Sequence, residues 1–147
     1  MAEELFDLEQ AEKLLPRLER LLRSAVESRQ QIAKIEQQYA NLVKDICLSG
    51  GRSVNVSEYS QHKMETAEGE KVLQQTVKEI ELLGCVIKDI EIGLIDFPCQ
   101  VADRDAYLCW RLGEPSIGFW HTVEEGFAGR KPIDEHFLTQ LRRPRPV

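Results

Sequence analysis

Residues 107–121 have the sequence YLCWRLGEPSIGFWH, which contains both tryptophans of the chain and one of its four cysteines. Apolar and polar side chains alternate on both sides of GEPS, as expected for two antiparallel strands joined by a turn. With GEPS as the turn, Trp110 is predicted to lie opposite Phe119. In this register Cys109 and His121 project to opposite faces, and a shift of one residue would reverse every such assignment.

The segments that precede this hairpin show the same alternation. CVIKDI and GLIDFP are bounded by glycine, proline or aspartate, and ADRD supplies a further turn. We therefore expect three or four short antiparallel strands over residues 85–122.

The first half of the chain has a helical period instead. Apolar residues recur every three or four positions from Leu8 to Ile46, which predicts a long helix over residues 7–48 with a kink near Pro16. The loop SGGRSVNV follows, and a second helix is expected over residues 57–84. The predicted fold class is α+β, with this long antiparallel helical hairpin packed against the small sheet.

The rest of the chain, residues 123–147, is predicted to form a loop, a short helix near residues 134–141 and a basic tail, LRRPRPV. All 147 residues are expected to form one domain. Since the second helix is shorter than the first, Leu8, Leu14, Leu15 and Leu18 would extend beyond it, and we expect them to cover the sheet.

Composition restricts the classes of partner. The net charge of −6, from 25 acidic and 19 basic residues, disfavours general nucleic-acid binding. The chain has no secretory signal pattern and no apolar run long enough to span a membrane, so we expect a cytoplasmic protein. The four cysteines form no C-x-x-C pair and are expected to be free thiols, and the sequence predicts no cofactor.

The apolar stripe on the first helix is wider than one neighbouring helix requires. Beyond the coiled-coil-like core positions, one flank carries Leu14, Leu21, Ile35 and Leu42, and the other carries Val26, Ala33 and Ala40. We therefore predict a homodimer that associates through the helical hairpin.

Six residues in the strand region could together form a pocket that binds a metal or polarises a carbonyl: Asp96, Cys109, His121, Glu124, Glu125 and Arg130. Asp96, His121, Glu125 and Arg130 are the candidate ligand-binding residues, with His121 and Glu125 the most interesting pair. The alternatives are structural: His121 as a satisfied edge residue, and Asp96 in a salt bridge with Arg111 or Arg130. The sequence predicts no metal site, because GFAG interrupts the segment that would have to supply further ligands.

A cysteine–histidine nucleophile is disfavoured because Cys109 and His121 are predicted on opposite faces. No catalytic residue is assigned.

The blocks GLIDFP, YLCWRLGEPSIGFWH and EEGFAGRKP together resemble an uncharacterised bacterial family, the domain of unknown function numbered twenty-two hundred and three. The similarity extends from FDLEQAEKLLPRL through GRKPI. This resemblance implies a small soluble bacterial protein and supplies no activity, cofactor or site.

Two classes of function are consistent with these observations. The first is a non-enzymatic, self-associating interaction or assembly module. The second is a small-molecule or metal-binding protein, possibly an enzyme, with a site at the rim of the sheet.

Overall fold

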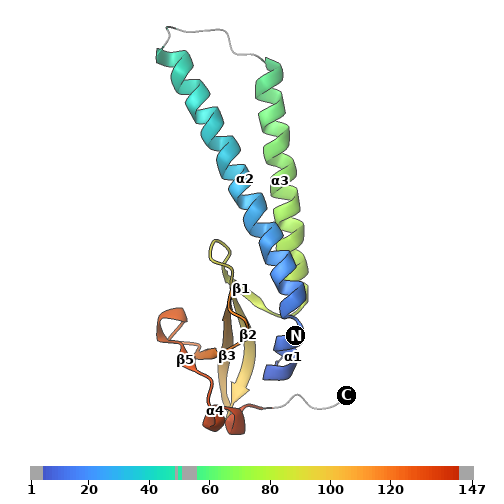
Figure 1. The fold of residues 1–147 in the computed structure, drawn as a ribbon, viewed down its shortest axis with the longest axis vertical. Coiled ribbons are helices and arrows are strands. Elements are labelled where there is room, and N and C mark those ends of the chain that lie inside the picture. Colours follow the sequence, from blue (N-terminus) through green and yellow to red (C-terminus); the bar gives the residue numbers. More distant parts are fainter. Residues whose placement is uncertain (1–4, 49, 51–55, 143–147) are drawn as a thin grey trace.

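The computed structural model describes residues 5–48, 50 and 56–142. Helices pack against a five-stranded antiparallel sheet, and the hairpin of α2 and α3 extends away from that sheet (Figure 1). The elements are α1 (Leu8–Lys13), α2 (Leu15–Leu48), α3 (Val56–Leu82), β1 (Val86–Asp89), β2 (Leu94–Val101), β3 (Arg104–Arg111), β4 (Phe119–Thr122), the 3-10 helix η1 (Phe127–Gly129), β5 (Lys131–Pro132) and α4 (Glu135–Gln140).

The first predicted helix is divided into two, α1 and α2. Asp7 caps α1 by accepting a 2.7 Å hydrogen bond from the backbone N–H of Gln10. Leu14 ends α1, and Pro16 is the second residue of α2. Since proline has no N–H to donate to the carbonyl of Glu12, the helix cannot continue with regular hydrogen bonds through this point. The interruption predicted near Pro16 is therefore confirmed, as a break between two helices.

The N-terminal leucines pack with the sheet, as predicted. Leu18 is fully buried in the main core, and Leu8, Leu14 and Leu15 pack against that core. The backbone N–H of Phe6 also donates to the carbonyl oxygen of Pro98 at 2.8 Å, which attaches the N-terminal segment to β2.

The sheet has strand order β1-β2-β3-β4-β5, and every neighbouring pair is antiparallel. Alternate side chains on β2 and β3 enter the same core as the helices. The strand residues of this face are Ile95, Phe97, Cys99 and Val101 on β2, with Ala106, Leu108 and Trp110 on β3.

The predicted register of the last hairpin is wrong by one residue. Cys109 pairs with Phe119, and Tyr107 pairs with His121. The reason is a longer connection than GEPS alone. Glu114 accepts from the backbone N–H of Arg111 at 2.7 Å through its side chain, and its carbonyl accepts from Trp110 Nε1 at 3.0 Å. Because these bonds hold a wide loop, β4 begins only at Phe119.

The sheet also has one strand more than the upper limit of the prediction. β5 pairs with β4 through Phe119 with Pro132 and Trp120 with Lys131, in a segment predicted to be loop. Two residues are too few to show alternation, and Pro132 is compatible only with an edge position. The short C-terminal helix is confirmed as α4, where Asp134 accepts from the N–H of Phe137 at 2.7 Å.

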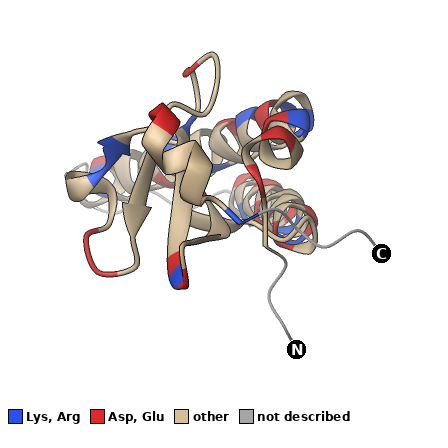
Figure 2. Cartoon of the chain, turned by 90° about the horizontal axis from the view of Figure 1, so that it is seen from below, with Lys and Arg blue, Asp and Glu red and all other residues tan. Residues whose placement is uncertain are grey.

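The two long helices keep the predicted antiparallel arrangement, and α3 lies within two residues of its predicted bounds. Figure 1 shows α2 and α3 diverging toward their connection. Seen along the hairpin from below, both helices carry acidic and basic residues side by side (Figure 2). In the described part of the chain, no helix is long and apolar enough to cross a membrane.

Candidate functional site

Three chemically capable side chains meet on the sheet face opposite the helices. Asp96 on β2 pairs with Cys109 on β3, and His121 lies on β4 beyond them. One potential ligand atom from each residue lies within 4.8 Å of the others, and all three residues are buried. We refer to them as the three-residue cluster.

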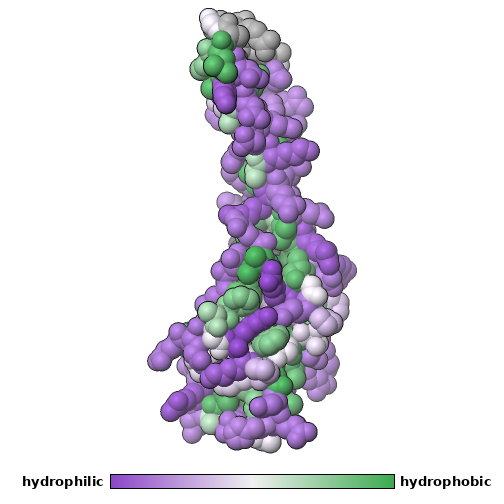
Figure 3. Space-filling view, turned by 60° about the vertical axis from the view of Figure 1, so that its left-hand side comes forward, coloured by the Kyte–Doolittle hydropathy of each residue, from purple (hydrophilic) through white to green (hydrophobic). Residues whose placement is uncertain are grey.

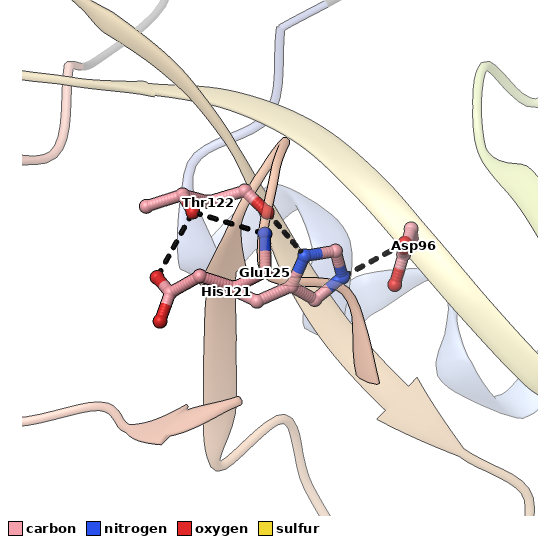
Figure 4. A network of polar contacts seen from close by, with 4 residues as sticks. All are labelled: Asp96, His121, Thr122 and Glu125. Atoms are coloured by element: carbon pink, nitrogen blue, oxygen red, sulfur yellow. Dashed lines mark hydrogen bonds and ion pairs between the residues drawn. The ribbon is translucent and has the colours of Figure 1, made fainter. Parts of the chain in front are cut away.

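The histidine ring is fixed from both sides (Figure 4). His121 Nδ1 lies 2.8 Å from the carbonyl oxygen of Thr122, and Nε2 lies 2.9 Å from Asp96 Oδ2. Because a carbonyl oxygen only accepts, Nδ1 must carry the proton of the first bond. A second proton must then lie between Nε2 and Oδ2, so the Asp96–His121 pair is neutral as a unit. The other carboxylate oxygen, Asp96 Oδ1, is buried and has no hydrogen-bond partner.

Cys109 completes the cluster as a protonated thiol. Burial raises its pKa to about 12, the neighbouring Asp96 carboxylate acts in the same direction, and a hydrogen bond from the guanidinium of Arg130 acts against them. The sequence-based reason for rejecting a cysteine–histidine nucleophile is wrong, because Cys109 and His121 share one face. In this state the thiol is nevertheless a poor nucleophile at neutral pH, since the thiolate is the reactive form.

Arg130 lies next to the cluster, but the carboxylate with which it forms an ion pair is that of Glu114. Its guanidinium makes a 3.1 Å salt bridge with Glu114 and lies 3.9 Å from the ring centre of Phe119. The predicted salt bridge of Asp96 with an arginine is therefore wrong, because the partner of Asp96 is His121.

Glu125 does not join the cluster. Its carboxylate accepts from Thr122 Oγ1 at 2.9 Å and pairs with Lys131 Nζ at 3.0 Å. The hydrogen bond from Lys131, together with that from Thr122, holds the pKa of Glu125 below its ordinary value. In Figure 4 this carboxylate points away from Asp96. Of the four predicted ligand-binding residues, the structure thus brings Asp96 and His121 together, with Arg130 beside Cys109 and Glu125 at the surface.

Comparison with known protein families gives a match. The family model described as an uncharacterised conserved protein, DUF2203, matches residues 4–133. The chain belongs to this family. No curated protein and no solved structure matches it. The DUF2203 match contains the hairpin, the sheet and the whole three-residue cluster, whereas α4 lies beyond it.

Cys109 was among the chemically capable residues of this DUF2203 sequence, but it was not one of the four predicted ligand-binding residues. Asp96 stands between the core residues Ile95 and Phe97, so alternation already directs it to the face away from the helices. The β2–β3 turn at ADRD then places Cys109 on that same face, and this signal was available. The face on which His121 lies could not be predicted in the same way, because it depends on the length of the loop before β4.

The cysteines of this DUF2203 protein should differ sharply in reactivity. Burial raises the pKa of Cys85 to about 11 and those of Cys99 and Cys109 to about 12, whereas Cys47 is exposed. We expect one fast-reacting thiol in the native protein and four after unfolding, measured with a chromogenic disulfide reagent at neutral pH. A Cys47→Ser variant should lose the fast phase. Two or more fast thiols in the native protein would contradict the burial of the other cysteines.

Proposed function

We propose that this protein is a non-enzymatic interaction or assembly module that self-associates as a homodimer through the distal half of its helical hairpin. The observation that carries this proposal is a groove of about 430 Å³ between α2 and α3. Its lining residues are Ile35, Glu36 and Tyr39 from α2, with Tyr59, His62, Lys63, Thr66, Ala67 and Glu70 from α3.

The distal half of the hairpin has little core of its own. No described side chain is fully buried in residues 36–48 of α2 or residues 57–75 of α3. Several large apolar side chains there are exposed, among them Val43, Leu48 and Met64. Figure 3 shows apolar residues near the tip of the hairpin, above a largely hydrophilic stem. Because helices in proteins gain most of their stability from packing an apolar face, this half favours a further packing partner.

Part of the wide apolar stripe predicted from sequence is already covered. Leu14 and Leu21 pack against the core shared with the sheet, so they are not available to a partner. Leu42, by contrast, lies in the distal half and is only partly buried. The proposed interface is therefore limited to the region around the groove.

The order of side chains along α3 favours a second copy of the chain as the partner. Lys63 and Glu70 both line the groove, and the small residues Thr66 and Ala67 lie midway between them. If two α3 helices cross antiparallel with the symmetry axis at this midpoint, Lys63 lies opposite Glu70 of the partner subunit. The symmetry repeats this ion pair, and the small central residues permit close approach of the helices.

A charge exchange tests this arrangement. We expect the unaltered protein to sediment at equilibrium with the mass of two chains at micromolar concentration. Lys63→Glu or Glu70→Lys alone should weaken the dimer at least about 10-fold, because each change places two like-charge pairs in the interface. The double variant should recover association, since the pairs form again with reversed signs.

Glu68→Lys is the matched control, because it makes the same charge change on α3 at an exposed residue outside the groove. It should leave the mass unchanged. A mass of one chain for the unaltered protein at every concentration would reject the dimer, and failure of the double variant to recover would reject this pairing.

For the location we propose the bacterial cytoplasm. All four cysteines are free thiols, which suits a reducing compartment.

A further inference from the structure

We propose that Asp96, Cys109 and His121 bind one divalent transition-metal ion of the zinc type. The sequence predicted no metal site, because further ligands were sought in the glycine-interrupted segment after His121. The pairing of β2, β3 and β4 supplies the donors from neighbouring strands instead. The proposal concerns the sheet and does not depend on the dimer.

The donor atoms suit such an ion. Imidazole nitrogen, carboxylate oxygen and thiolate sulfur are the three ligand types that zinc takes in proteins. His121 Nε2 and Asp96 Oδ2 are 2.9 Å apart, and two ligands held at about 2.0–2.1 Å on a tetrahedral ion lie about 3.3–3.4 Å from each other, so these two atoms would separate by about 0.5 Å. The three ligand atoms all lie within 4.8 Å of one another. The Cys109 sulfur would therefore have to move by about 1 Å to form a bond of about 2.3 Å to an ion held by the other two atoms.

Two features of the cluster point to a ligand beyond the protein. Asp96 Oδ1 is buried without any hydrogen-bond partner, which is costly unless another group approaches it. The bond from His121 Nδ1 to the carbonyl oxygen of Thr122 is the support that metal-binding histidines usually have. It fixes the ring and directs Nε2 toward the other two donors.

The charges balance on binding. Without metal, the Asp96–His121 pair holds two protons and is neutral, and the Cys109 thiol is also neutral. When the ion binds, the proton between Nε2 and Oδ2 and the thiol proton leave to solvent, while Nδ1 keeps its own. A carboxylate, a thiolate and a neutral imidazole then carry two negative charges against the two positive charges of the ion, so the buried site stays neutral.

The neighbouring positively charged side chains, Arg130 and Lys88, have partners of their own, which reduces their repulsion of a bound metal ion. The charge of Arg130 is paired with Glu114 at 3.1 Å, and Lys88 lies over the ring of Tyr107, 5.3 Å from its centre. The ring of Tyr107 is also a neighbour of the His121 ring, with the two ring centres 5.4 Å apart.

The test uses the full chain without an affinity tag, freed of metal with a chelator and then titrated with Co²⁺ alone. We expect one Co²⁺ per chain, a near-ultraviolet cobalt–thiolate absorption band, and loss of that band when Zn²⁺ is added. Zn²⁺ should also raise the melting temperature of the unaltered protein, because the ion binds the folded chain.

Matched variants locate the site. Cys109→Ala should abolish the thiolate band, whereas Cys99→Ala, which removes a buried thiol from the opposite face of the same sheet, should keep it. Cys47→Ser should keep the band as well, since that exposed thiol is far along the chain from the cluster. Glu125→Gln should also leave binding unchanged, because we expect that His121 and Glu125 are not ligands of the same ion.

Several results would overturn the proposal. Absence of Co²⁺ binding and of any Zn²⁺-dependent melting shift in the unaltered protein would do so without any variant, even if Cys109→Ala fails to fold. A band that survives Cys109→Ala, or one that is lost in Cys47→Ser, would assign the metal to another thiol and reject this site.

Discussion

Deleting residues 1–15 is expected to destabilise the protein by more than about 5 kcal/mol, which approaches the whole stability of many domains. The deletion removes buried Phe6 and Ala11 together with Leu8, Leu14 and Leu15, which pack against the shared core. It also removes the hydrogen bond from Phe6 to Pro98 that attaches this segment to β2. Thermal unfolding followed by circular dichroism measures the effect, and an unchanged melting temperature would show that the segment does not cover the sheet.

A point variant gives a graded form of the same test. The ring of Phe6 packs edge to face on Phe97, with centres 5.4 Å apart. Phe6→Ala should cost about 3–4 kcal/mol in the free energy of unfolding, because it leaves a cavity between the N-terminal segment and β2. Glu9→Ala is the control at an exposed position of α1, where loss of the 3.4 Å pair with Lys13 should cost less than about 1 kcal/mol. Equal costs for the two variants would contradict the packing of Phe6.

The second large effect is expected at the buried Asp96–His121 pair. His121→Phe should lower the free energy of unfolding by about 3–5 kcal/mol in metal-free protein with chelator present, because it leaves Asp96 buried without its partner. Urea unfolding gives this value directly. The control is Glu19→Gln, which breaks the exposed 2.8 Å pair with Arg23 and should cost less than about 1 kcal/mol.

The double variant Asp96→Val/His121→Phe separates the cost of an unpaired group from the cost of altered packing. With both polar partners removed, much of the loss should be recovered, since no buried group then lacks a hydrogen bond. The single variants Asp96→Val and His121→Phe complete the cycle. If the double variant loses as much free energy of unfolding as the two single variants together, the pair is not coupled in the way the 2.9 Å contact indicates.

The sequence by itself determined the elements and their broad packing. A period of three to four residues before Gly84 and of two residues after it separates helix from strand, because each period is set by the backbone geometry of its own element. Pro16 marked the helix break, since the missing N–H is a local property. The unequal lengths of the two long helices were enough to predict that the N-terminal leucines cover the sheet.

Only the tertiary structure decided the strand registers, and with them which side chains of neighbouring strands lie on the same face of the sheet. The register of β4 depends on how Glu114 holds the preceding loop, and a difference of one residue moves His121 from the face opposite Cys109 to the same face. β5 exists only because β4 is in place to pair with it. Asp96 could be recognised in sequence as a carboxylate inside an apolar strand. Its partner, however, depends on two registers, that of β2 with β3 and that of β3 with β4. Side chains alternate with a period of two, so an error in either register exchanges the faces and hides the cluster.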